Sequence, residues 1–192
     1  MKTITLFAVL LVFSLTGVSQ KLSLDIEKSS IEWTGKKVGG QHNGDIDFIS
    51  GYINKSEEGY SSGEFLVDMN SLTVDDITDA DTNAKLVGHL KSDDFFGVAD
   101  YPNAKLSVKK GVLQEEDIYE FEGYLTIKGK TKAVKITANM LSINGLPTFF
   151  GQLIVDRSDF DVRYGSGSFF DNLGDNVIYD DFILNFKVIF TK

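Results

Sequence analysis

The chain has 192 residues, with 28 acidic against 19 basic side chains and a formal net charge of −9. An acidic balance of this size argues against a protein that binds nucleic acid through a general electrostatic footprint. The chain contains no cysteine, which excludes a disulfide framework and a cysteine nucleophile. Its 15 phenylalanines and single tryptophan indicate a large packed core, a cavity with aromatic walls, or both.

Residues 1–19 have the features of a secretory signal peptide. Lys2 gives a positive start, Ile4–Leu15 is almost wholly apolar, and Gly17-Val18-Ser19 places small residues before a cleavage site. The apolar run is too short for a comfortable membrane span, and no later segment is long and apolar enough to cross a bilayer. We therefore expect cleavage after Ser19, a single domain over residues 20–192 with no integral membrane segment, and a periplasmic or secreted location.

Alternation of apolar and polar residues predicts strands along most of the remaining chain, with one buried and one wet face. In chain order, the alternating apolar positions are Ile31 and Trp33; Ile46 and Phe48; Phe65, Val67 and Met69; Tyr119, Phe121, Leu125 and Ile127; Val134, Ile136, Ala138 and Met140; and Phe182, Leu184, Phe186, Val188 and Phe190. Lys128-Gly129-Lys130 predicts a tight hairpin between two of these runs. Asn144-Gly145 has the residue pair of primed turns, in a connection that we expect Pro147 to lengthen.

Two segments depart from the strand pattern. Lys85–Pro102 begins like an amphipathic helix, for which Asp81 is the expected N-cap, and it ends at a proline that disfavours helical geometry in the residue before it. Asp159–Asp181 is rich in Asp, Gly, Ser and Asn and predicts a long, partly ordered connection before the last strand.

Many antiparallel strands joined by short turns predict an all-β sandwich or barrel. Gly51 and Gly123 fall within predicted strands, where glycine permits the sharp bends of barrel corners. A barrel of about eight strands is just wide enough for its own side chains or for one small ligand.

Signatures of catalysis and of metal binding are absent or incomplete. The two histidines, His42 and His89, are far apart and stand in no metal-ligand spacing. Gly59–Gly63 matches the letters of a GxSxG nucleophile elbow around Ser61, but a turn precedes it and a strand follows, whereas the elbow needs a strand and then a helix. The aspartate-rich stretches lack EF-hand spacing and are interpreted as solvated loop carboxylates. We therefore expect no catalytic residue, no metal site and no cofactor.

One stretch is specific enough to suggest a family. His89–Phe96, with the sequence HLKSDDFF, and the following Tyr101-Pro102 resemble the signature of YceI-like proteins, which are polyisoprenoid-binding, lipocalin-like exported proteins. Weaker matches follow the same order at Ile31–Gly35, Gly44, Gly63–Val67, Asn70–Leu72, Leu125–Lys132 and Arg157–Phe160. The chain departs from the family pattern at Leu86-Val87, where an Arg-Asp pair is common, and at Asp161, where glycine is common.

The resemblance implies an all-β fold, an extended eight-stranded antiparallel barrel like that of lipocalins, with one short helix and a long apolar tunnel. It also implies a non-catalytic protein that carries or sequesters an apolar lipid, isoprenoid or quinone-like, inside the barrel. The residues expected to line the tunnel are Trp33, Phe48, Phe65, Phe121 and Phe186. Phe95 and Phe96 are expected to close one mouth, where Lys85, His89 and Lys91 would meet a polar or phosphate head.

Other interpretations stay open. Each phenylalanine could serve ordinary core packing, and His89 could be a hydrogen-bonded structural residue. The chain could be a structural or stress-response interaction module whose barrel is filled by its own side chains, or a hydrolase using Ser61 or a carboxylate pair. A homodimer is an alternative to a single copy.

Overall fold

The structure is a computed structural model that describes residues 19–191, so the expected signal peptide lies outside the described residues apart from Ser19. The described elements are β1(Gln20–Leu24), β2(Ser30–Lys37), β3(Gly40–Asp45), β4(Phe48–Ser56), β5(Gly59–Asp68), η1(Met69–Ser71), α1(Ala80–Lys91), β6(Asn103–Glu115), β7(Ile118–Ile127), β8(Lys130–Ile143), β9(Leu146–Asp156), η2(Arg157–Phe160), η3(Gly174–Asn176) and β10(Ile178–Thr191). No helix within residues 19–191 is long and apolar enough to span a membrane.

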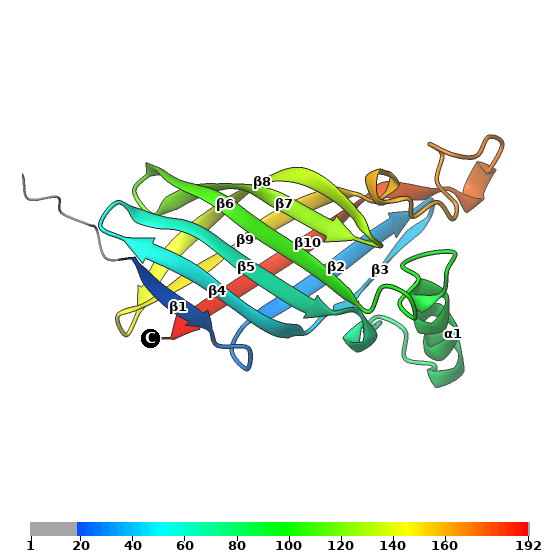
Figure 1. Cartoon of the computed structure of the whole chain (residues 1–192). Coiled ribbons are helices and arrows are strands. Elements are labelled where there is room, and N and C mark those ends of the chain that lie inside the picture. Colours follow the sequence, from blue (N-terminus) through cyan, green and yellow to red (C-terminus); the bar gives the residue numbers. More distant parts are fainter. Residues whose placement is uncertain (1–18, 192) are drawn as a thin grey trace, which may run out of the picture.

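Eight strands close into an antiparallel barrel, as the sequence predicts (Figure 1). β1 pairs with β4, the sheet then runs in chain order from β4 to β10, and β10 pairs back to β1 through Leu24 and Phe190. The rest of β10 pairs with β2, which forms a hairpin with β3. The β2–β3 hairpin therefore extends the barrel wall beyond the point where β1 ends.

The two ends of the barrel differ. The hairpin turns of β4–β5, β6–β7 and β8–β9 lie at one end, together with the C-terminus (Figure 1). Helix α1, the β2–β3 turn and the connection from β9 to β10 lie at the opposite end (Figure 1). Here we call this second end the helix end.

Two tight turns follow from their sequences. Lys128 and Gly129 have φ values of 47° and 70°, and Asn144 and Gly145 have 54° and 77°. Positive φ at both central residues is the geometry of type I′ hairpin turns, which twist in the same sense as their strands. The predicted lengthening by Pro147 is wrong, because Pro147 lies inside β9 opposite Ser142 and the loop keeps two residues.

Helix α1 begins two residues before the expected position. Its N-cap is Asp79, whose carboxylate accepts hydrogen bonds from the Thr82 N–H at 2.9 Å and from the Thr82 hydroxyl at 2.6 Å. The predicted N-cap Asp81 is instead in the first turn. There its negative charge interacts favourably with the positive end of the helix dipole. The helix ends where the backbone N–H and the hydroxyl of Ser92 both donate to the carbonyl of His89.

The free edge of β3 is covered by the segment 73–76. The Thr73 N–H donates to the Asp45 carbonyl at 3.1 Å and the Asp75 N–H to the Asn43 carbonyl at 2.8 Å. Between these bonds the backbones approach so closely that a Cβ on Gly44 would lie 2.1 Å from the Thr73 carbonyl oxygen. Only glycine fits this crossing, which protects the edge from pairing with other chains.

We expect Gly44→Ala to lower the free energy of unfolding by about 1–3 kcal/mol, the usual cost of forcing an extra methyl group into packed structure. Gly88→Ala is the matched control, because it lies within helix α1 with no atom within 4 Å of its Cβ and should gain about 0.5–1 kcal/mol. Urea denaturation of both variants provides the measurement. A Gly44→Ala protein as stable as the parent would contradict the close approach.

Candidate functional site

Side chains that alternate along the strands enclose an apolar cavity of about 150 Å³ inside the barrel. β10 contributes five of them at every second position, Phe182, Leu184, Phe186, Val188 and Phe190. All the described residues that line this inner cavity are apolar except Lys105, and its ammonium group lies 3.5 Å from the Glu64 carboxylate. The inner cavity therefore offers almost pure hydrocarbon and aromatic surface.

The inner cavity has an aromatic floor toward the end away from the helix. The rings of Tyr60 and Phe149 meet edge to face with centroids 5.0 Å apart, and Tyr119 stacks on Phe121 at 5.7 Å. Phe121 and Phe149 line the cavity, and both tyrosines are buried behind them. Burial raises the pKa of Tyr60 and of Tyr119, because an apolar environment disfavours a phenolate.

A second cavity, of about 110 Å³, lies at the helix end of the barrel. Ile46, Phe96 and Phe182 belong to the walls of both cavities. The rings of Phe96 and Phe182 meet at nearly a right angle, with centroids 6.4 Å apart. This pair of side chains forms the partition between the two spaces.

The structure brings together seven of the ten residues expected to bind a ligand. Phe48, Phe65, Phe96, Phe121 and Phe186 line the inner cavity. Trp33 and Phe95 line the second cavity, which Phe96 shares. Lys85, His89 and Lys91 line neither cavity. Contact between a ligand and any of the ten residues stays a prediction.

The three expected head-group residues have other surroundings. Lys85 is exposed on helix α1, and the Lys91 ammonium donates to the Asn70 carbonyl at 2.7 Å. The ring of His89 packs edge to face on Phe95 at 5.1 Å and on Tyr164 at 4.4 Å. His89 therefore joins the helix to the β9–β10 connection by ring packing. Within residues 19–191 its ring makes no hydrogen bond, so the interpretation as a hydrogen-bonded structural residue stays a prediction.

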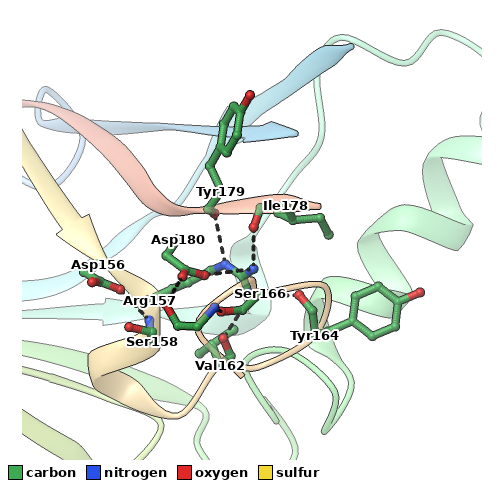
Figure 2. A network of polar contacts seen from close by, with 10 residues as sticks. Asp156, Arg157, Ser158, Val162, Tyr164, Ser166, Ile178, Tyr179 and Asp180 are labelled. Carbon is green, nitrogen blue, oxygen red and sulfur yellow. Dashed lines mark hydrogen bonds and ion pairs between the residues drawn. The ribbon is translucent and has the colours of Figure 1, made fainter. Parts of the chain in front are cut away.

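Arg157 holds the β9–β10 connection against the barrel (Figure 2). It is only 4% exposed, and its guanidinium is surrounded by backbone carbonyls (Figure 2). The acceptors are Tyr179 O for Nε at 3.2 Å, Val162 O and Tyr164 O for Nη1 at 2.8 and 2.9 Å, and Ile178 O for Nη2 at 3.0 Å. Nη2 also lies 3.3 Å from the Asp180 carboxylate. Four of the five N–H donors of the guanidinium therefore form hydrogen bonds, and the ion pair adds no hydrogen bond to Asp180 Oδ1.

The Arg157 guanidinium also connects the two sequence motifs that suggest the family. Its carbon lies 5.8 Å from the ring centre of Phe95, and Phe95 in turn contacts His89. Burial lowers the pKa of Arg157, and the neighbouring carboxylates of Asp180 and Asp156 oppose that shift. Arg157 stays charged because even a lowered arginine pKa lies far above neutrality.

Sequence reasoning missed several residues of the cavity walls. Phe182 and Phe190 share the alternating face of Phe186, so the pattern itself could have identified them. Arg157 and His42 gave no such signal, because their partners are carbonyls of a distant connection and a carboxylate 34 residues away.

The GxSxG letters around Ser61 do not form a nucleophile elbow. Ser61 lies within strand β5, directly after the β4–β5 turn, and its hydroxyl donates to the Asn54 carbonyl at 3.5 Å. An elbow requires a helix after the serine, and β5 continues as a strand to Asp68. Within residues 19–191, no group of three or more His, Asp or Glu side chains could hold a metal ion.

The fold and the site define a closed antiparallel β-barrel with an apolar interior, covered at one end by a helix and a long connection. Residues 22–190 match the YceI-like domain. The chain therefore belongs to the YceI-like family, which confirms the resemblance seen in the sequence. Asp161 has φ 63° and ψ 29°, a left-handed conformation that favours glycine, the residue common at this position in the family.

Several solved structures have the same fold. BcnA of Burkholderia cenocepacia has a TM-score of 0.72 and 23% identity, covering 88% of this chain and 99% of that one. A polyisoprenoid binding domain from Saccharophagus degradans has a TM-score of 0.62 and 16% identity, covering 88% and 97%. The YCEI protein of Campylobacter jejuni has a TM-score of 0.54 and 19% identity, covering 100% and 99%. No curated protein sequence matches the chain.

Arg157→Lys should lower the free energy of unfolding by about 2–4 kcal/mol, because an ammonium cannot reproduce the planar set of donors and leaves buried carbonyls without partners. Arg163→Lys is the control, since Arg163 is exposed, pairs with Asp161 and lies over the ring of Phe169, and its replacement should change stability by less than about 0.5 kcal/mol. Urea denaturation measures both. We also expect faster hydrogen exchange over residues 162–179 in Arg157→Lys, and equal stability of the two variants would contradict the role of Arg157.

Proposed function

We propose that the protein binds an apolar, isoprenoid-like lipid inside the barrel and carries or sequesters it without catalysis. The observation that carries the proposal is the inner cavity, whose walls are apolar except for Lys105. The ammonium group of Lys105 forms an ion pair with Glu64. A domain of the same fold is described as polyisoprenoid binding, and this supports the ligand class. A polyprenyl or quinone-type chain has the composition that such walls favour.

The energetics of such a complex are those of hydrocarbon transfer. Each methylene moved from water into an apolar cavity contributes about 0.8 kcal/mol, so affinity grows with the length of chain that is accommodated. Apolar cavities hold water poorly and accept apolar guests. No hydrogen-bonding group inside the barrel is required.

A long chain needs more space than the 150 Å³ of the inner cavity. The second cavity adds about 110 Å³ and is separated from the first by Phe96 and Phe182. Rotation of these two rings would join both spaces into one tunnel that opens at the helix end. We therefore assign Phe96 the role of a gate, whereas Phe95 is buried between Arg157 and His89 and seals the same end.

The alternative of an interaction module with a filled barrel requires a packed interior, and the inner cavity argues against it. We further propose that the protein acts in the periplasm or outside the cell, on the basis of the signal peptide predicted from residues 1–19.

The direct test is mass spectrometry of lipids extracted from protein purified from its native host. We expect a prenyl or quinone-type lipid in stoichiometric amount, and uptake of added farnesol by protein that has been stripped of lipid. Repeated recovery of empty protein that takes up neither farnesol nor a quinone would reject the proposal.

Ala138→Phe should reduce farnesol uptake at least about tenfold, because Ala138 lines the inner cavity and is 1% exposed, and a larger side chain occupies the space of the ligand. Ala133→Phe is the matched control, since Ala133 lies exposed on the same strand, β8, and should leave uptake unchanged. Fluorescence titration with farnesol gives the affinities and circular dichroism checks folding. Equal uptake by the two folded variants would place the ligand outside the inner cavity.

A further inference from the structure

The wall of the second cavity carries basic but no acidic side chains. Its ionisable members among the described residues are Lys36, Lys37, His42, Arg157 and Tyr179. The chain as a whole has 28 acidic and 19 basic residues, so a cavity wall without Asp or Glu is contrary to the overall composition. A positively charged wall in an acidic protein favours a ligand that carries a negative charge.

The basic residues of this wall are not equivalent. Four of the five Arg157 donors bond to backbone carbonyls, and Nη2 also lies 3.3 Å from the Asp180 carboxylate, so the guanidinium is already engaged within the protein. Lys37 lies at the end of β2 on the inner face, two positions beyond Gly35, and its ammonium has no hydrogen-bond or ion-pair partner within residues 19–191. Lys36 borders the same cavity, but alternation along β2 places its side chain on the outer face.

His42 stands beside Lys37 on the same inner face. It pairs with Gly35 across the β2–β3 hairpin, while Lys37 pairs with Gly40. The Nδ1 atom of His42 lies 2.8 Å from the Asp76 carboxylate, which also accepts a hydrogen bond from the Asn43 N–H at 3.1 Å. Although burial acts to raise it, the pKa of Asp76 is lowered by these two hydrogen bonds and by the charge of His42.

The Asp76 carboxylate has two effects on His42. It accepts the imidazole proton on Nδ1, and it fixes the orientation of the ring. The other ring nitrogen, Nε2, has no partner among the described residues and can donate to an anion once the ring is protonated. His42 and Lys37 together thus provide two donors beside an apolar cavity.

We infer that the bound lipid carries an anionic head, of the phosphate class, which lies against Lys37 and His42 at the β2–β3 hairpin. The inference rests on the proposed function and adds the position and charge of the polar end. The proposed head-group site is therefore at the β2–β3 hairpin. It replaces the site expected at Lys85, His89 and Lys91, which line neither cavity. Asp76 acts as a positioning residue through His42.

The test compares farnesyl monophosphate with farnesol, which have the same chain and differ in the head. The parent protein should bind the phosphate at least about tenfold more tightly, because hydrogen bonds between charged groups are strong beside an apolar site. Lys37→Gln and His42→Gln should each remove most of this preference and leave farnesol affinity unchanged. Lys85→Gln is the matched control, because Lys85 is exposed on helix α1 and lines neither cavity. It should retain the full preference, and circular dichroism checks that every variant is folded.

The outcomes separate the two proposals. Equal affinity of the parent for both probes, or an equal loss in Lys85→Gln and Lys37→Gln, would overturn the head-group site and leave lipid binding intact. Failure to bind either probe would overturn the proposed function itself. Inorganic phosphate should not displace farnesyl monophosphate at comparable concentration, and efficient displacement would show a site for free phosphate instead of a lipid head.

Discussion

The structure depends on the closure of the sheet by β10. This strand hydrogen-bonds with β9 along one edge and with β2 and then β1 along the other. Because a barrel has no free edge, every inward residue of β10 is held against the opposite wall. The inward side chains leave an unfilled space between them, and this space is the inner cavity. The same constraint that stabilises the barrel therefore creates its site.

Pairing of the strands closes the barrel wall but leaves its two ends open. Each end is covered in a different way. Away from the helix, aromatic rings from β5, β7 and β9 form a packed floor. At the helix end, the cover is helix α1 and the β9–β10 connection, joined through Phe95, His89, Tyr164 and Arg157. The backbone carbonyls around Arg157 keep a charged side chain buried, so the cover has a fixed position. A ligand would enter beside this cover, through the partition formed by Phe96 and Phe182.

The adjacent phenylalanines of the signature stretch show how one dipeptide serves two tasks. Phe95 is buried in the contacts that fasten the cover, and Phe96 belongs to the walls of both cavities. The chain winds tightly after the helix, since the Phe96 N–H donates to the Leu90 carbonyl and the Val98 N–H to the Lys91 carbonyl. This local winding turns neighbouring side chains toward different surroundings.

The strands, the two type I′ turns and the wall positions of Phe48, Phe65, Phe121 and Phe186 could be predicted from the sequence, because period-two alternation and turn residues are local properties. The sequence misplaces the N-cap by two residues, because Asp79 and Asp81 are equally good acceptors and the choice depends on where the backbone leaves the extended conformation, which is after Asp79. Only the tertiary structure decided which ionisable residues face a cavity. The partner of His42 lies 34 residues away in the sequence. The acceptors of Arg157 come from a connection that folds back over it. Contacts between such distant residues are fixed by barrel closure and not by any local pattern.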